Sequence, residues 1–220
     1  MLKFISKNAG ILGLFAIITT GLIALTYWQT KDRIYQAQQT QLLSILNQLV
    51  PEESHDNALH TDCIIIPANP LLGDRTQRAY RARLEQQNQA IIIETTAPDG
   101  YSGDIQIVVA VDTQETVLGA RVLKHKETPG LGDKIDTRVS DWIYGFAEVV
   151  YNEEVSNRWK VKKDGGQFDQ FTGATITPRA VVRAIANAAA YVNQHQDQLY
   201  TVPANCEAPV ENAEATDERI

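Results

Sequence analysis

The chain has 220 residues and a formal net charge of −7, which suits one ordinary domain with appendages. Its charged fraction of 21% and hydrophobic fraction of 44% are those of a chain that folds. The 20 Lys and Arg residues are scattered along the chain, so no basic patch is present to neutralise phosphates, and we expect no nucleic-acid partner.

The N-terminal region contains a long uncharged segment, with no charge between Lys7 and Lys31. As a helix, residues 9–28 would be about 30 Å long, the thickness of a bilayer core, and a Tyr-Trp pair ends the run at the depth of an interfacial aromatic belt. A cleaved signal peptide is the alternative, but the run is long for its apolar region and no clear cleavage site follows. We therefore predict an uncleaved transmembrane helix at 9–28.

The charges that flank this span favour one orientation. Lys3 and Lys7 precede the span, whereas Lys31 and Arg33 follow it and are offset by Asp32. The positive-inside rule then places residues 1–8 in the cytoplasm and the main domain outside it.

A second helical pattern follows the span. Apolar residues recur at spacings of three and four beyond it, before Pro51 and a polar stretch end the pattern. The sequence predicts a membrane-proximal helix over 29–50 that lifts the domain off the bilayer. The apolar positions are Ile34, Leu42, Ile45 and Leu49.

The middle of the chain reads as strands. Four short runs, three of them rich in β-branched residues, are separated by polar or Gly-containing turns with no helical pattern between them. Such short connections predict an antiparallel meander. The predicted strands are 80–85, 90–97, 105–112 and 117–125. A further hairpin is expected in 159–171, around Asp164-Gly165-Gly166.

A last helix should close the domain at residue 201, because four apolar residues form a helical stripe that the sheet can bury. These residues are Val181, Ile185, Ala188 and Val192. We thus predict an α+β fold, in which a single N-terminal transmembrane helix precedes an antiparallel-sheet domain with packed helices over 51–201. The Pro-, Ala- and Glu-rich residues 202–220 should form a disordered tail.

The cysteines leave one question open. An oxidising compartment would permit a bridge between Cys63 and Cys206. Two lone cysteines in unrelated contexts fit a pair of free thiols equally well. The sequence therefore does not decide whether they pair.

The start of the last helix, Thr-Gly-Ala-Thr-Ile-Thr-Pro, is unusually rich in hydroxyls. Thr177 is a good N-cap and Pro178 a good first-turn residue, so we expect the helix to begin at Pro178. Thr175 would then lie near free backbone N–H groups and the positive end of the helix dipole, where an anion is stabilised.

The small residues before Thr175 add to this expectation. Gly173 and Ala174 leave room for a bulky group to approach the backbone, and Arg179 adds a cation. This pattern fits a threonine that holds a phosphate, either bound or covalently attached. A plain capped helix start is the alternative, because Thr-Pro and Gly are common there.

Two other loops draw attention. In His-Lys-Glu-Thr-Pro-Gly-Leu-Gly-Asp-Lys, 125–134, Pro129-Gly130 fits the centre of a type II turn, Gly132 adds a flexible joint and Leu131 would be exposed. In Pro-Asp-Gly-Tyr-Ser-Gly-Asp-Ile, 98–105, Tyr101 lies in a Gly-rich turn. Taken singly, each loop also fits an ordinary connection. No pair of histidines has metal-ligand spacing, and no nucleophile–base arrangement stands out.

The three loops together, behind one N-terminal span, resemble the FMN-binding domain of ion-translocating redox complexes, and most of all the G-type subunit of the Rnf electron-transport complex. The C-type subunit of the sodium-translocating NADH:quinone reductase is similar. The resemblance covers nearly the whole chain. The attachment signal of the family, Ser/Thr/Asp-Gly-Ala-Thr-x-Ser/Thr, matches throughout at 172–177.

The resemblance implies that Thr175 is esterified to the phosphate of FMN, and that a flavin transferase installs the cofactor from FAD. It places the loop 127–132 beside the flavin, with Leu131 packed on the ring. The residues implied at the site are Thr172, Gly173, Ala174, Thr175, Thr177, Glu127, Thr128, Gly130, Leu131, Gly132, Lys134, Tyr101 and Ser102.

The implied function is electron relay in a complex of the bacterial inner membrane, where ferredoxin/NAD electron transfer is coupled to ion movement and other subunits of the complex are the partners. The chain would have no acid–base active site of its own. Two alternatives remain: a flavoprotein like the C-type subunit of the sodium-translocating reductase, and a non-enzymatic membrane-anchored binding module.

Overall fold

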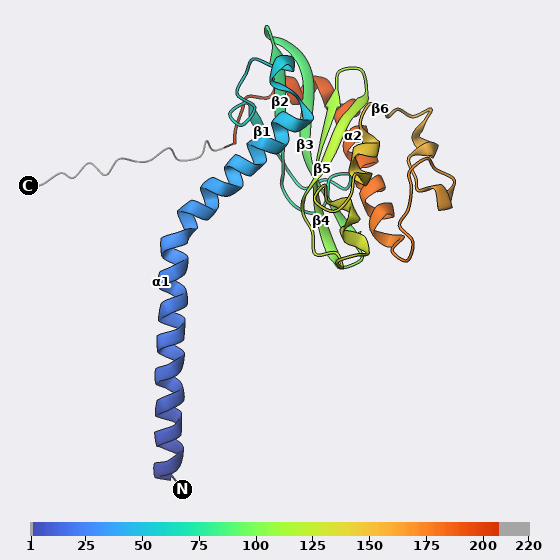
Figure 1. Cartoon of the computed structure of the whole chain (residues 1–220). Helices are drawn as coiled ribbons and strands as arrows, with labels where there is room; N and C mark the ends of the chain where they lie inside the picture. Colours follow the sequence, from blue (N-terminus) through green and yellow to red (C-terminus); the bar gives the residue numbers. More distant parts are fainter. Residues whose placement is uncertain (1, 207–220) are drawn as a thin grey trace, which may run out of the picture. The chain divides into compact units, whose positions relative to one another are not determined.

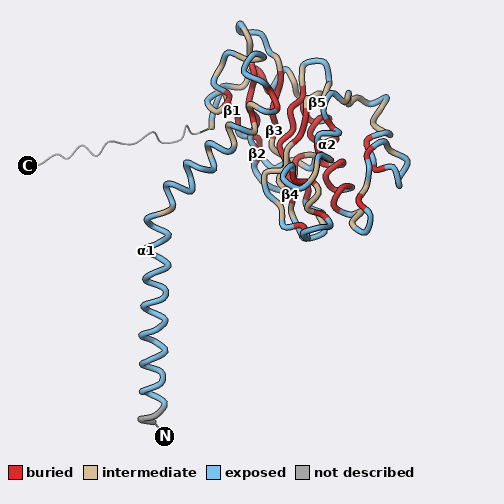
Figure 2. The backbone as a smooth tube through the Cα atoms, viewed as in Figure 1, coloured by how far each residue is buried: buried red, intermediate tan, exposed pale blue. Residues whose placement is uncertain are grey.

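The computed structural model describes residues 2–206, which fall into two compact units, Met1–Ser44 and Ile45–Ile220. The described residues of the first unit, 2–44, are all helical. Helix α1, Leu2–Leu49, contains the chain's one candidate membrane span among the described residues, and no part of the apolar window is buried by protein. Most of α1 is coloured as exposed in Figure 2. Four of its threonines, Thr19, Thr26, Thr30 and Thr40, bond back to carbonyls one turn earlier, so these hydroxyls are satisfied without water.

The second unit is built on one antiparallel sheet whose six strands follow chain order (Figure 1). The strands are β1 Cys63–Ile66, β2 Gln77–Leu84, β3 Gln87–Gly100, β4 Gly103–Asp112, β5 Thr116–Lys124 and β6 Val149–Val150. The meander and the α+β class predicted from the sequence are confirmed. The sequence did not reveal β1 and β6, which have only four and two residues.

Helix α2, Ile176–Thr201, covers one face of this sheet and packs mainly on β3 and β4. Ile91, Ile93 and Val109 face it, and all three are fully buried. The helical stripe predicted from Val181 to Val192 lies in this core. On the opposite sheet face, the end of α1 buries Leu46 and Leu49, with Leu49 against Gly119. Figure 2 shows the buried layer running through the strands and α2.

Short 3₁₀ helices fill the connections: Glu52–Ser54, Gly132–Ile135, Trp142–Phe146, Ser156–Arg158 and Lys162–Asp164. The hairpin predicted around Asp164-Gly165-Gly166 is wrong. The chain instead makes a 3₁₀ turn followed by Gly165 in the left-handed region. Trp159 and Phe168 pack on Phe146, with the two phenylalanine rings stacked at 4.3 Å, and all three rings are buried in this arrangement.

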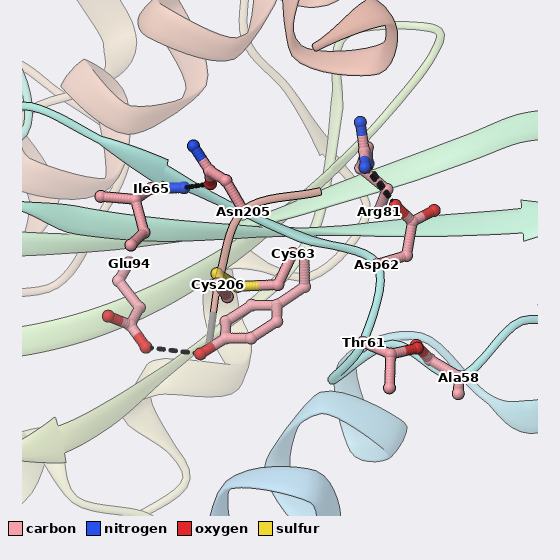
Figure 3. The surroundings of a disulfide bond; sticks show 10 residues. Ala58, Thr61, Asp62, Cys63, Ile65, Arg81, Glu94, Asn205 and Cys206 are labelled. Carbon is pink, nitrogen blue, oxygen red and sulfur yellow. Dashed lines mark hydrogen bonds and ion pairs between the residues drawn. A yellow bond between two sulfur atoms is a disulfide. The ribbon is translucent and has the colours of Figure 1, made fainter. Parts of the chain in front are cut away.

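The C-terminal end of α2 is fastened to β1 and β2 (Figure 3). Cys63 and Cys206 form a disulfide, and the Asn205 N–H donates to the Cys63 carbonyl at 3.0 Å. The buried Arg81 guanidinium donates to the Val202 carbonyl and forms an ion pair with Asp62. The first residues of the predicted tail, 202–206, are thus held on the domain, and the remainder of that prediction, 207–220, lies outside the described residues.

Candidate functional site

Helix α2 begins earlier than its sequence suggested. Its first residue is Ile176 and its N-cap residue is Thr175, whose carbonyl accepts the Arg179 N–H at 3.3 Å. The predicted cap at Thr177, with Pro178 as first residue, is wrong. Thr177 lies inside α2, and its buried hydroxyl donates to the Glu127 carboxylate.

The residues before the helix form a tight turn that presents Thr175. Gly173 has a φ of +80°, a region that other residues enter only with strain. Thr172 and Gly173 are exposed, while Ala174 and Thr175 are partly buried. The residues before Thr175 thus combine a positive-φ glycine with little side-chain bulk.

The Thr175 hydroxyl makes no hydrogen bond to any group of residues 2–206. Beside it, the N–H groups of Ile176 and Thr177 likewise donate to no acceptor in this part of the chain, and Pro178 has no N–H. Unpaired amides at the positive end of a 26-residue helix are a favourable place for a phosphate group. The residues present therefore fit a phosphoester on Thr175.

The second loop carries the predicted type II turn. The Thr128 carbonyl accepts the N–H groups of Leu131 at 3.1 Å and Gly132 at 3.2 Å, and Gly130 has a φ of +77°. Leu131 is 44% exposed at the tip. A Cβ at Gly173 would lie 4.0 Å from Leu131 Cδ2, so this loop meets the turn before Thr175.

The third loop joins β3 to β4 through the two-residue turn Tyr101-Ser102 between the paired Gly100 and Gly103. The Tyr101 ring is exposed. The Ser102 N–H donates to Glu127 Oε1 at 2.9 Å. All three sequence motifs thus meet at one buried carboxylate, and this partnership was not foreseen because its members are 25 and 50 residues apart.

The cations near α2 differ in availability. Arg179 is bound by Asp164 through two hydrogen bonds of 2.5 and 2.6 Å, so the charge expected beside Thr175 is already paired. Arg183 likewise pairs with Asp99. Lys134, at the end of the second loop, is partly buried, and its ammonium forms no ion pair within residues 2–206.

A polar network of His125, Asp136 and Arg138 holds the backbone of Glu127 in place. The Glu127 N–H donates to His125 Nδ1 at 3.1 Å, so the proton of the neutral ring lies on Nε2, which faces Asp136 at 3.6 Å. The Arg138 guanidinium lowers the pKa of the Asp136 carboxyl to about 2 through its hydrogen bonds and charge. His125 was expected only to end a strand, but it orients the second loop.

Comparison with known proteins assigns both parts of the chain. Residues 100–190 match the FMN-binding domain family, a range that contains the turn Tyr101-Ser102 and both other loops, and residues 1–49 match the RnfG N-terminal region. A relative from Vibrio vulnificus (strain YJ016), named as the G-type subunit of the ion-translocating oxidoreductase complex, is 53% identical over 206 residues, which cover 94% of this chain and 98% of that one. The proteins of the same name from Vibrio cholerae serotype O1 (strain M66-2) and Aliivibrio fischeri (strain ATCC 700601 / ES114) are 53% and 52% identical, and the match covers 94% of this chain and 99% of each of theirs.

The chain belongs to the RnfG family, the G-type subunits of ion-translocating oxidoreductase complexes. The resemblance seen in its three loops is thereby confirmed.

Thr175 of this RnfG-family protein lines none of three surface hollows of about 350–410 Å³ on the domain. Three large apolar side chains are exposed near Thr175 or on the loops that converge beside it: Leu131, Tyr101 and Ile176, at 44%, 67% and 49%. Ile176 is a member that the sequence did not single out, although it directly follows Thr175.

Proposed function

We propose that this chain carries FMN as a phosphoester of Thr175 and relays electrons within an ion-translocating oxidoreductase complex of the bacterial inner membrane. The observation that carries the proposal is the unbonded Thr175 hydroxyl beside two unpaired amides at the start of α2, inside a range that matches the FMN-binding domain family. The names of the relatives supply the complex.

The attachment step follows from the position of this hydroxyl. In the active site of a flavin transferase, the Thr175 oxygen would attack the phosphorus of the FMN half of FAD. An O–P bond forms, the bond to AMP breaks, AMP leaves and the hydroxyl proton passes to solvent or to a base of the transferase. The product is a phosphodiester with one negative charge, which the helix start stabilises. Thr175 is the acceptor in this step and not a catalyst.

The other site residues would hold and shield the cofactor. Thr172, Gly173 and Ala174 allow it to approach the backbone, and Leu131 and Tyr101 offer apolar surface to a flavin ring. Lys134 supplies a cation that pairs with no acid of residues 2–206, while Thr128 and Gly130 shape the loop that carries Leu131. When bound, FMN supplies the redox chemistry, including one-electron steps, and the protein supplies placement and polarity.

The proposed setting is a single-pass inner-membrane protein, with residues 1–8 in the cytoplasm and the domain over 51–201 in the periplasm. Two features support it: α1 is long and apolar enough to cross a membrane, and disulfides such as Cys63–Cys206 persist in oxidising compartments. The partners would be the other subunits of the complex, with ferredoxin/NAD electron transfer as the driving reaction. The match of residues 1–49 to the RnfG N-terminal region favours this over a role in the sodium-translocating reductase or as a binding module.

Peptide mass spectrometry tests the attachment. The full-length chain, coexpressed with a flavin transferase and purified in detergent, is digested with trypsin, which releases residues 164–179 as one peptide. We expect a mass increase of FMN less one water, with fragmentation that assigns it to Thr175. An unmodified peptide, together with a denatured gel band that does not fluoresce, would overturn the proposal.

A further inference from the structure

We propose that Glu127 is the positioning residue that makes Thr175, rather than its neighbour Thr177, the attachment hydroxyl. This inference deepens the proposed function and rests on it. In this role the Glu127 carboxylate positions the residues of the attachment site and does not itself contact the flavin.

The start of α2 offers two hydroxyls that a flavin transferase could modify. Thr175 and Thr177 are two residues apart, and both lie at the start of α2. Thr177 Oγ1 donates to Glu127 Oε2, and the Thr177 residue is 1% exposed. That bond holds Thr177 in a buried position, out of reach of a transferase, whereas Thr175 is the N-cap residue and its hydroxyl makes no hydrogen bond within residues 2–206.

The other carboxylate oxygen of Glu127 has a partner of its own. Glu127 Oε1 accepts the Ser102 N–H at 2.9 Å, which ties the β3–β4 turn to the same side chain. Glu127 is 5% exposed and forms no ion pair with a cation of residues 2–206. Two donors and the positive end of α2 are therefore what stabilise its carboxylate in this buried place. Replacement of Glu127 would release two loops from the helix start at once.

Gly132 closes the space around the bond between Thr177 and Glu127. A Cβ at Gly132 would lie 2.6 Å from Glu127 Oε2 and 2.8 Å from Thr177 Oγ1. Contacts this short would force the two side chains to shift, so a Cβ here would disturb the bond between them. The sequence treated Gly132 as a flexible joint, whereas the structure requires it for space. Gly132→Ala is thus an independent way to break the same bond.

The experiment uses the full-length chain coexpressed with a flavin transferase and compares Glu127→Ala, Glu127→Gln and Gly132→Ala with the wild type. The matched controls are Glu154→Gln, at an exposed acid, and Gly145→Ala, where an added Cβ meets nothing within 4 Å. Flavin per chain is read from in-gel fluorescence, and the modified threonine is identified in peptide 164–179.

We expect Glu127→Ala and Gly132→Ala to lower flavin loading about tenfold, as the loss of a hydrogen bond to a charged group would. Part of the remaining flavin should shift to Thr177. Glu127→Gln should be intermediate, because its amide keeps one acceptor oxygen for the two donors. Both controls should load like the wild type.

A second readout needs no flavin. In chains made without the transferase, hydrogen exchange should quicken at Ser102 and in the first turn of α2 for Glu127→Ala, while the β3 and β4 core stays protected. Wild-type loading at Thr175 in Glu127→Ala would overturn this inference and leave the proposed function standing. Loss of loading that only parallels a loss of circular dichroism signal would also overturn it. A wild-type chain with no FMN on Thr175 would overturn the proposed function itself, and the exchange data would still show whether Glu127 holds the two loops.

Discussion

The Ala174 N–H donates to the Phe171 carbonyl at 3.2 Å, and the two residues form an isolated antiparallel bridge. Phe171 is buried against Trp142, with ring centroids 5.0 Å apart. The turn before Thr175 is therefore fixed at one end by the aromatic core and at the other by α2. Its tip, Gly173, takes the positive φ that closes so short a turn.

Gly173→Ala should destabilise this turn by about 1 kcal/mol, because alanine is strained at a φ of +80°. We expect lower flavin loading at Thr175 and a slightly lower Tm, with the rest of the fold unchanged. Gly145→Ala is the control, since nothing crowds an added Cβ there. Equal loading in both variants would contradict the prediction.

Substitutions at Thr175 itself separate a covalent role from a capping role. Thr175→Ala should abolish flavin fluorescence in the denatured gel band, whereas Thr175→Ser keeps a hydroxyl and should retain part of it. The Tm should change little, because the Thr175 side chain makes no capping bond. Thr113→Ala, at an exposed threonine of the β4–β5 turn, serves as the control, and its band should stay fluorescent. A fluorescent Thr175→Ala band would contradict attachment at this residue.

Arg81→Ala should destabilise the domain by roughly 3 kcal/mol, the order found when one partner of a buried ion pair is removed. Arg81 is 4% exposed, pairs with Asp62 and donates to the Val202 carbonyl after α2. Arg75→Ala is a useful comparison, because its pair with Asp104 is exposed and should contribute less than about 1 kcal/mol. Denaturant titration followed by tryptophan fluorescence measures both, and equal losses would argue against the role of Arg81.

Removal of the disulfide should also lower stability. Cys63 and Cys206 are 143 residues apart, so their link restricts the unfolded chain strongly, and Cys63→Ser with Cys206→Ser should cost about 2–5 kcal/mol. The flavin should remain on Thr175, which lies at the other end of α2. Denaturant unfolding with and without a reductant checks the first expectation and peptide mass spectrometry the second. An unchanged midpoint on reduction would show that the link is dispensable.

The Asp136–Arg138 pair predicts a pH dependence. In the folded chain, Arg138 lowers the pKa of Asp136 to about 2, below the value of about 3.9 for a free aspartate. The pair therefore adds stability that is fully present above about pH 4 and is lost as the pH falls towards 2. The Tm difference between the wild type and Asp136→Asn should shrink over this interval, and a difference independent of pH would contradict the assignment.

Sequence reasoning found what local chemistry determines. The long strands are runs of β-branched residues, and the turn at Gly130 needs only its own Pro-Gly pair, so both could be predicted. The start of α2 could not, because the partner of Thr177 is Glu127, 50 residues earlier. The hairpin near Gly165 failed for a similar reason, since Trp159 and Phe168 pack on Phe146 instead.

The short strand β1 and the disulfide also depend on distant segments. Cys63–Ile66 has too few residues to show a period, and its pairing with Gln77–Leu84 becomes visible only in the fold. The pairing of Cys63 with Cys206 remained undecided because it too becomes visible only in the fold. Each functional motif could be recognised from the sequence by itself, but the convergence of all three on the Glu127 carboxylate could not.

One unbroken helix, α2, has Thr175 at one end and the fastening of Arg81 and Cys206 at the other. A helix of this length, about 39 Å, is rigid, unlike the long flexible arms that carry a bound group between active sites in some enzymes. The cofactor of this protein would therefore keep a fixed position on the domain, and its electron donor and acceptor would have to bind within electron-transfer distance of that position.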